Sequence, residues 1–253
     1  TASITFTGNG VSGVVYNWTA TGDALTGLAT NGTNSIPSFS GVNATNNILT
    51  ATITVIPRAN GCDGPSKTFT ISVKPIPVLS NVPTTPNYFP VCSGKPVNFT
   101  PVSPTQNADI TNFTWLRTAI INITPAPAGA IGTGSGIINE TLTNTTSSPI
   151  FVTYTYTLNA NGCSSTQDVI IRIDPTPIVT AKTALICSTT GFSITPADAT
   201  DGDLIPSGTT YSWVAPSVTG IAGTNSGTNA TSISETALTN STNAPIDVVY
   251  SVT

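Results

Sequence analysis

Polar and apolar residues alternate with a period of two along several stretches of this chain. The clearest stretch, IFVTYTYT at 150–157, places Ile150, Val152, Tyr154 and Tyr156 on one side of an extended backbone and mostly threonine on the other. A period of two is typical of a β-strand with one buried face, whereas a helix needs a period near 3.6. Threonine suits the wet face, because its branched Cβ favours extended backbone. No stretch shows a sustained helical stripe, so the pattern predicts an all-β chain.

The same pattern returns three times along the sequence. The motifs YNW, FTW and YSW place Trp18, Trp115 and Trp213 about 97 residues apart. The alternating stretch itself has counterparts at 49–56 and 246–253, and both keep the apolar side while the polar side changes. A unit of about 95–100 residues therefore repeats.

We predict three units, and the printed sequence holds all of the second but only part of the other two. The first repeat (1–76) lacks its beginning, the middle repeat (77–176) is complete, and the third repeat (177–253) lacks its end. The chain is therefore expected to be a piece of a longer array. Pro-x-Pro segments at 74–78 and 174–179 separate the units, and proline stiffens such connections. We expect an extended rod.

Each unit is predicted to be an Ig-like β-sandwich. Asn-Gly-Cys at 60–62 and 161–163 follows the alternating strand, and Asn-Gly favours a tight hairpin turn. Further strands of the middle repeat are expected at 96–100, 110–116, 119–123 and 138–142. The glycine-rich stretch IGTGSG at 131–136 is interpreted as a turn-rich connection. About seven short strands separated by turn signals are typical of a sandwich.

The aromatic residues of the repeated motifs are expected in the core. They are Trp18, Trp115, Trp213, Tyr154, Tyr156 and Tyr250. The alternative for the tryptophans is a platform on which a ligand stacks.

The four cysteines suggest an oxidising compartment, and their pairing has two interpretations. Cys92 and Cys163 belong to the middle repeat, and we favour a bond between them, although an Ig-type order would place them at opposite ends of the sandwich. The alternative joins Cys163 to a cysteine of the preceding repeat. Cys62 and Cys187 would pair with residues outside this sequence.

Composition argues against several functions. Only 7% of the residues are charged, against roughly 25% in ordinary soluble domains. Seven lysines and arginines give no basic surface for nucleic acid, and no apolar run approaches the ~20 residues needed for membrane insertion. Histidine is absent, and the two glutamates, Glu140 and Glu235, occupy equivalent positions in their repeats. We therefore expect no enzyme.

One acidic cluster is a weak candidate for a metal site. Asp198, Asp201 and Asp203 lie in ADATDGDL, and loop carboxylates can hold calcium. The matching loop of the middle repeat keeps only Asp109, which favours a solvated loop instead. No other cofactor is expected.

Several segments together resemble a known repeat: VCSGKPVNFTP, TNFTWL, NETLTNTTSSPIFVTYTYT, NGC and PTPIV. They are similar to the PKD-like, Ig-like repeats of very large cell-surface adhesins from Bacteroidetes, including gliding-motility adhesins. The resemblance implies export by the type IX route, display on the bacterial surface and an extended string of domains. It carries no catalytic residues.

The expected function is therefore mechanical: a semi-rigid spacer in surface attachment or gliding motility. Its expected partners are neighbouring repeats of the same chain, other surface or filament proteins, and possible surface glycans. Two alternatives remain, namely accessory modules of a secreted hydrolase and repeats that bind glycans directly.

Overall fold

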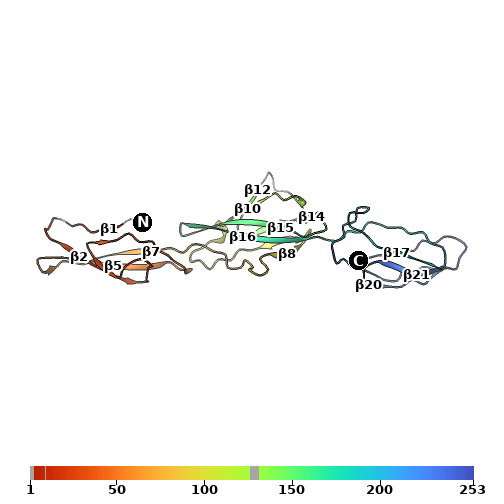
Figure 1. Ribbon diagram of the computed structural model, residues 1–253, viewed down its shortest axis with the longest axis horizontal. Helices are drawn as coiled ribbons and strands as arrows, with labels where there is room; N and C mark the ends of the chain where they lie inside the picture. Colours follow the sequence, from red (N-terminus) through yellow and green to blue (C-terminus); the bar gives the residue numbers. More distant parts are fainter. Residues whose placement is uncertain (1–2, 9, 126–130) are drawn as a thin grey trace.

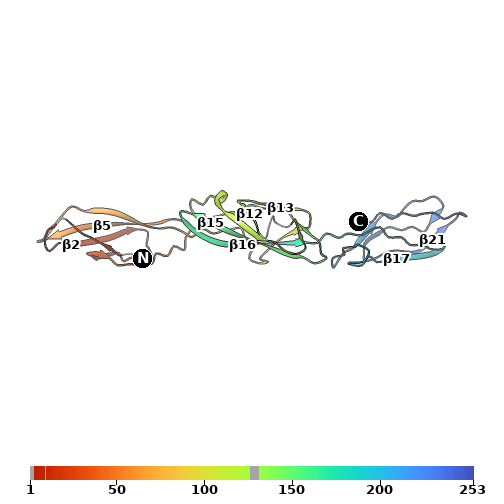
Figure 2. The same ribbon diagram turned by 90° about the horizontal axis from the view of Figure 1, so that it is seen from above.

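The computed structural model describes residues 3–8, 10–125 and 131–253, and it shows three groups of strands placed end to end (Figures 1 and 2). Within the described residues, each hydrogen-bonded ladder stays inside one group. The one helical element of the described chain is the 3-10 turn η1 (Ile110–Asn112), so none of its helices has the length to cross a membrane. The prediction of an all-β rod of sandwiches is confirmed.

The strands divide among the repeats as follows. The first repeat contains β1 (Ile4–Thr5), β2 (Val15–Gly22), β3 (Asn31–Thr33), β4 (Ser35–Ile36), β5 (Leu49–Ala59), β6 (Cys62–Asp63) and β7 (Lys67–Val73). The middle repeat contains β8 (Phe89–Cys92), β9 (Pro96–Phe99), β10 (Thr114–Thr118), β11 (Ile123–Thr124), β12 (Ile131–Ser135), β13 (Ile138–Thr141), β14 (Thr143–Asn144), β15 (Ile150–Ala160) and β16 (Cys163–Asp174). The third repeat contains β17 (Thr190–Ile194), β18 (Tyr211–Trp213), β19 (Ile221–Ala222), β20 (Gly227–Ala230) and β21 (Ile233–Asn240).

The middle repeat is the fullest sandwich. Its main sheet has the order β12-β10-β15-β16-β8, and the ladders β13-β9 and β11-β14 lie opposite. The core between these layers takes Tyr154 and Tyr156 from β15, Trp115 from β10, and Phe99 and Ile138 from the opposing ladder. Because both layers contribute apolar faces, the sandwich closes around one core.

The alternation in the sequence becomes an alternation of burial in β15. Val152, Tyr154 and Tyr156 are fully buried, whereas Thr153 is exposed and Thr155 is half-buried. The prediction of a half-buried strand is confirmed.

The tryptophans point inward in all three repeats. Trp18, Trp115 and Trp213 are each at most 8% exposed. Tyr250 is half-buried and packs against the core of the third repeat.

The Asn-Gly-Cys motif makes the predicted hairpin. Asn161 and Gly162 have φ values of 56° and 77°, so both central residues have positive φ, as a type I′ turn requires. The turn sets the register of β15 and β16, which pair along eleven residues from Ile150 to Ala160. Asn60 and Gly61 repeat the geometry in the first repeat, with φ values of 50° and 82°.

The interpretation of 131–136 as a turn-rich connection is wrong, because β12 lies there and pairs with β10. Trp115 and Gly134 are direct partners across this pair, and a Cβ on Gly134 would lie 2.3 Å from the Trp115 ring. Glycine in a strand often marks such a close approach. The pairs Trp18–Gly32 and Trp213–Gly227 repeat the arrangement.

Three other details of the middle repeat differ from expectation. The 110–116 strand begins only at Thr114, because Asp109 caps η1 by accepting the Thr111 N–H at 3.0 Å. The 119–123 strand is a turn that leads into the short β11. The unpredicted β8 pairs in parallel with β16 at the sheet edge, where Pro90 is tolerated.

Candidate functional site

The first contact between repeats is a two-bond clamp around Gln106. The Gln106 backbone N–H donates to the Asn46 carbonyl at 2.7 Å, and the Ile48 N–H donates to Gln106 Oε1 at 2.7 Å. One residue of the middle repeat thus binds two backbone groups of the first repeat. We call this contact the first joint.

The loop held by Gln106 is built on an Asn-x-Thr turn. Asn43 Nδ2 donates to the carbonyls of Asn47 (2.7 Å) and Val73 (2.8 Å), and its Oδ1 accepts the backbone N–H of Thr45 at 2.9 Å. Such side-chain bonds replace the ladder bonds that a turn cannot make. The loop is therefore preformed before it meets its neighbour.

The other two repeats build the same turn. Asn144 Nδ2 donates to the carbonyls of Ser148 (2.7 Å) and Ile173 (3.0 Å), and Asn144 is itself buried. In the third repeat, Asn240 Nδ2 donates to the Ala244 carbonyl at 2.8 Å. We call the end of a repeat that carries this turn its trailing end, and the end that carries the Asn-Gly-Cys hairpin its leading end.

The second joint brings together the equivalent loops with different chemistry. Ser147, in the Asn-x-Thr turn of the middle repeat, donates to Asp198 of the third repeat. Asp198 also accepts the Ile205 N–H at 2.9 Å. The Ser147 hydroxyl first, and then the Ile205 amide, lower the pKa of Asp198 below its ordinary value, because both stabilise the carboxylate.

The Pro-x-Pro connections are tied to the repeat that follows them. At the first joint, Ser165 donates its hydroxyl proton to the Pro77 carbonyl, and the Leu79 N–H donates to Gln167 Oε1 at 2.9 Å. At the second joint, Ile178 and Leu204 exchange two backbone bonds of 2.8 Å. Hydrogen bonds therefore restrain the backbone of both Pro-x-Pro connections along part of their length.

The weak calcium candidate is not supported, because Lys182 already pairs with two of its carboxylates and the third faces the second joint. Lys182 Nζ lies 2.9 Å from Asp203 and 3.3 Å from Asp201, so an ammonium group stands where a cation would be needed. Asp198 faces the second joint instead. Within the described residues, no group of three metal-ligating side chains comes together.

The favoured Cys92–Cys163 bond is wrong in this structure. Cys163 begins β16, whereas Cys92 pairs with Asp174 at its other end. β16 has 12 residues, so at about 3.3 Å per residue the two cysteines lie roughly 36 Å apart, far beyond the ~7 Å that a disulfide allows. All four cysteines are free thiols, and none is buried.

A buried ionic network lies inside the middle repeat. Arg117, only 1% exposed, donates from Nε to Glu140 Oε2 at 2.7 Å and from Nη2 to Oε1 at 3.2 Å. Tyr154 donates its hydroxyl proton to the same carboxylate. Burial tends to lower the pKa of Arg117, but the bond and charge of Glu140 raise it overall. Burial, and then Glu140, raise the pKa of Tyr154, so the phenol stays neutral.

The equivalent positions of the third repeat use neutral donors instead. Glu235 accepts from the Asn225 backbone N–H at 2.8 Å, from Asn225 Nδ2 at 2.9 Å and from the Tyr250 hydroxyl at 3.1 Å. Ala215 stands two residues after Trp213, where the middle repeat has its arginine. Asn225 therefore supplies the bonds that Arg117 supplies in the middle repeat.

The first repeat has no ionisable group at these positions. The register of β2 with β5 makes Ala20 and Ile53 the counterparts of Arg117 and Tyr154, and Ser38 stands in place of the glutamate. The network thus takes three forms in three copies, which is typical of a structural position rather than of catalytic chemistry.

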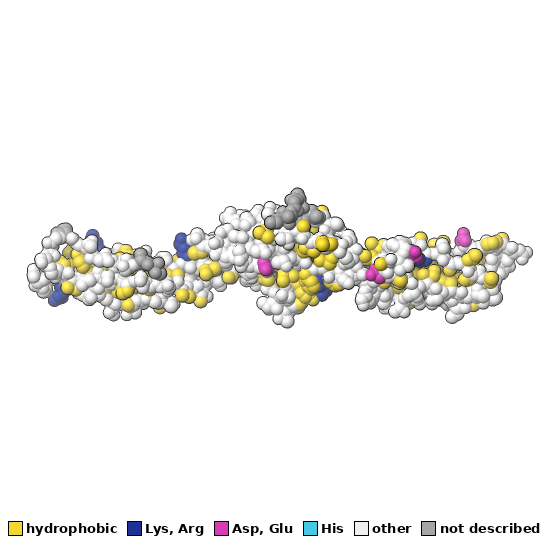
Figure 3. Space-filling model, turned by 45° about the horizontal axis from the view of Figure 1, so that its top comes forward, with side chains coloured by type: hydrophobic (Ala, Val, Ile, Leu, Met, Phe, Trp, Pro, Cys, Tyr) yellow, Lys and Arg dark blue, Asp and Glu magenta, His cyan; other side chains and the backbone are white. Residues whose placement is uncertain are grey.

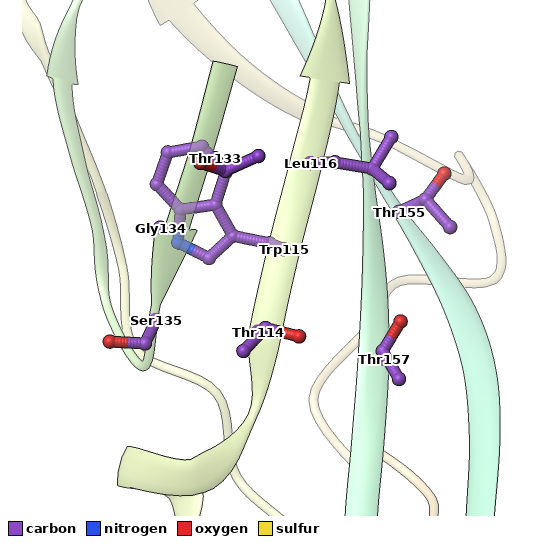
Figure 4. Close-up of a pocket in the computed structure, with 8 residues that line it drawn as sticks. All are labelled: Thr114, Trp115, Leu116, Thr133, Gly134, Ser135, Thr155 and Thr157. Atoms are coloured by element: carbon purple, nitrogen blue, oxygen red, sulfur yellow. The ribbon is translucent and has the colours of Figure 1, made fainter. Parts of the chain in front are cut away.

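A shallow hollow of about 330 Å³ lies over β10, β12 and β15 of the middle repeat (Figure 4). Four threonines line it, together with Trp115, Leu116, Gly134 and Ser135. The Trp115 ring lies across β12 at Gly134 and is 8% exposed. None of the lining residues is ionisable, so the hollow offers no acid or base, and its tryptophan presents little surface for stacking.

A more exposed aromatic cluster lies on the outer face of β15 and β16. Phe151 is 51% exposed and packs edge-on against Tyr88, with ring centroids 5.3 Å apart. Arg172 lies 4.7 Å from the Tyr88 ring centre and donates to its hydroxyl at 2.6 Å. The equivalent cross-strand pair of the first repeat is Thr50 and Ser72, so this cluster distinguishes the middle repeat.

Sequence reasoning found the strands that position these sites but missed the contacts themselves. Gln106 has no repeated counterpart of its own type, since Asp201 occupies the matching position in the third repeat. The Asn-x-Thr turn carried a signal, because NAT, NTT and NST recur at 43–45, 144–146 and 240–242. On the face drawn in Figure 3, charged side chains are sparse and apolar side chains are spread over all three repeats.

Two comparisons with known proteins bear on this architecture. Residues 90–177 and 184–253 match the family model described as "PKD-like domain". No curated protein matches the chain.

Proposed function

Because the chain belongs to the PKD-like domain family, we propose that it is a structural and adhesive repeat segment of an extracellular bacterial surface adhesin or filament. In this role the repeats are a semi-rigid spacer. They hold an adhesive region away from the cell or transmit pull along the surface. Neighbouring repeats are the main partners, and other surface or filament proteins are further ones.

The observation that carries this proposal is the way successive repeats are joined. Gln106 binds two backbone groups of the first repeat, and the connection beyond Pro77 is bonded to the middle repeat. A flexible linker would make no such bonds. Each bond contributes only about 0.5–1.5 kcal/mol, so the joints limit bending without fusing the repeats into one body.

Surface display, gliding motility and type IX export rest on the sequence resemblance. The direct test replaces the repeats in the parent gene by a Gly/Ser-rich segment of equal contour length. The mean end-to-end distance of a flexible coil grows only with the square root of its number of residues, so the coil spans less distance than a rod of the same contour length. The proposal therefore predicts weaker attachment or slower gliding at unchanged surface exposure. Full attachment and gliding with the coil would contradict the spacer role.

The same strain separates the adhesin from the hydrolase alternative. Antibody against the repeats should label intact cells, and attachment should fail when the repeats are deleted. If deletion instead removed a secreted hydrolytic activity and left attachment unchanged, the repeats would be accessory modules of an enzyme.

A second candidate function, direct glycan binding, is favoured by the exposed Phe151–Tyr88 pair, because exposed aromatic rings are the groups on which sugar faces stack. A glycan array probed with the chain and with Phe151→Ala tests it. Saturable binding that is lost in the variant supports this function, with Thr153→Ala as the matched control on the same face. Equal signals from chain and variant would contradict it.

A further inference from the structure

Cys92 and Cys187 lie at trailing ends. Cys92 is followed by Ser93, whose hydroxyl accepts the backbone N–H of Asn144 at 2.9 Å, and Asn144 begins the Asn-x-Thr turn. In the third repeat, the Ser188 hydroxyl accepts the Asn240 N–H at 3.0 Å. Both cysteines are exposed. The trailing ends of the middle and third repeats therefore each present a thiol beside the Asn-x-Thr turn.

Cys163 lies at the leading end of the middle repeat, where the first joint is formed. It follows Asn161, whose Nδ2 donates to the Gln106 carbonyl at 2.7 Å, and Gln106 is the residue that clamps the first repeat. A thiol of the hairpin thus lies beside the joint. Cys62 occupies the same hairpin position in the first repeat and is exposed.

The register shows where a trailing-end cysteine would sit at the first joint. Cys92 pairs with Asp174, and the counterpart of Asp174 in the first repeat is Lys74, directly after β7. Lys74 Nζ lies 3.8 Å from a Cβ built on Gly162, the neighbour of Cys163. The Lys74 side chain therefore reaches across the first joint to the hairpin that carries Cys163.

We propose that the trailing-end cysteine of one repeat and the hairpin cysteine of the next form a disulfide across the joint. This inference rests on the proposed function as a string of repeats. Within the printed sequence, the first joint contains Cys163 and the second joint contains Cys92, and the partner position at each joint falls outside the sequence. Two copies of the chain can still supply one complete pair, with Cys187 at the trailing end of one copy and Cys62 at the leading end of the other.

The exposure of the cysteines supports a covalent role. Free cysteine is among the most buried residue types, whereas here three thiols are exposed and the fourth is half-buried. A bond from the trailing end of one repeat to the leading end of the next is head-to-tail, so it can recur at every joint of a string of repeats.

The bond forms by thiol–disulfide exchange with a disulfide oxidant, such as oxidised glutathione or an oxidised protein dithiol. A thiolate attacks the oxidant, and one of the oxidant's sulfurs leaves as a thiol. The second thiolate then attacks the mixed disulfide and releases the other sulfur. Two cysteine thiols lose two protons and two electrons, and the oxidant's disulfide becomes two thiols.

The test uses two variants of the full chain, both with Cys92→Ser and Cys163→Ser. One also carries Cys62→Ser and keeps Cys187, and the other also carries Cys187→Ser and keeps Cys62. Each variant alone keeps one thiol and cannot make the proposed bond. Mixed in a glutathione redox buffer, the two variants should give a covalent dimer on a non-reducing gel. Mass spectrometry of its digest should find the Cys62 peptide joined to the Cys187 peptide, and reductant should remove the dimer.

The outcomes that would overturn the proposal are equally concrete. Equal dimer in either variant alone would show same-site cross-linking, and no dimer in the mixture at any concentration would show that the ends do not meet. Small-angle scattering on the reduced chain distinguishes failure of the disulfide proposal from failure of the proposed spacer role. An elongated profile without cross-linking rejects the disulfide alone, whereas a compact profile rejects the spacer.

Discussion

The interior of the middle repeat and its two joints are held together in opposite ways. Inside, fully buried aromatic and aliphatic side chains surround a buried arginine whose charge is paired with Glu140. At the joints, a few polar contacts join exposed loops, with Gln106 at one and Ser147 with Asp198 at the other. The first arrangement resists unfolding, whereas the second only limits the angle between neighbours.

This difference teaches how stiffness is distributed along the chain. Substitutions in a repeat interior should change the free energy of unfolding and leave the joint geometry unchanged. Substitutions at the joints should do the reverse.

The largest effect is expected from Arg117→Ala. It leaves Glu140 and the Tyr154 hydroxyl without their cation, and breaking a buried pair in this way costs about 3–5 kcal/mol. Urea unfolding, followed through the fluorescence of the middle repeat, measures the change. A loss below about 1 kcal/mol would show that the network is dispensable.

The first repeat supplies a matched control for this variant. Arg117→Ala combined with Glu140→Ser and Tyr154→Ile copies Ala20, Ser38 and Ile53. Because no buried charge then remains unpaired, the triple variant should recover part of the stability lost in Arg117→Ala.

Gly134→Val should follow in size, with a loss of about 2–3 kcal/mol. Its Cβ would lie 2.3 Å from the Trp115 ring, and overpacking of this kind forces side chains and backbone apart. Thermal unfolding is the measurement. Thr133→Val, on the exposed face of the same strand, should stay within about 0.5 kcal/mol of the unsubstituted chain, and equal effects at both positions would refute the close Trp–Gly contact.

Asn144→Ala should cost about 1–2 kcal/mol, because it leaves the Ile173 carbonyl without its donor and removes the bond to Ser148. Asn240→Ala, at the half-buried counterpart, should cost less. Chemical denaturation of the two variants compares a fully buried turn asparagine with a half-buried one. A larger loss for Asn240→Ala would reverse the expected order.

The smallest effect is a loosening of the second joint in acid. The pKa of Asp198 is lower in the folded chain than in the unfolded chain, where it is about 3.9. The Asp198 carboxylate therefore stabilises the second joint above about pH 3.9, and this stabilisation is lost as the pH falls through the folded-state pKa. Spin-label distances between Thr153→Cys and Ser234→Cys should broaden below about pH 3.9. The first joint, clamped by the neutral Gln106, should show no matching change, and Asp198→Asn should remove the acid response at the second joint.

The sequence was enough to predict the elements whose signal is local. The alternation of 150–157, its counterpart at 49–56 and the Asn-Gly turns predict the strands, their buried faces and one hairpin type correctly. The strand expected at 246–253 is wrong, because this stretch forms only the isolated bridge between Trp213 and Val252. Periodicity works here because each strand has one face in the core and the other in water.

What failed depends on long-range pairing. Ile131–Ser135 looks like a connection because glycine is poor in strands, and only its pairing with Trp115 explains the glycines. Membership of one repeat favours a Cys92–Cys163 bond, but the parallel pairing of β8 places the two residues at opposite ends of β16. The aspartate cluster is only a weak cation candidate in the sequence, and the position of Lys182 beside it cannot be read from spacing.

The most direct test of the central claim is a distance distribution across the first joint. Spin labels at Thr19→Cys and Thr153→Cys, in a chain whose native cysteines are replaced by serine, report the placement of the first repeat on the middle one. We predict a single narrow distribution that broadens in Gln106→Ala combined with Pro75→Gly and Pro77→Gly, while the free energy of unfolding stays nearly constant. A distribution equally broad in both chains would contradict the account, because the repeats would then be linked flexibly and could not act as a semi-rigid spacer.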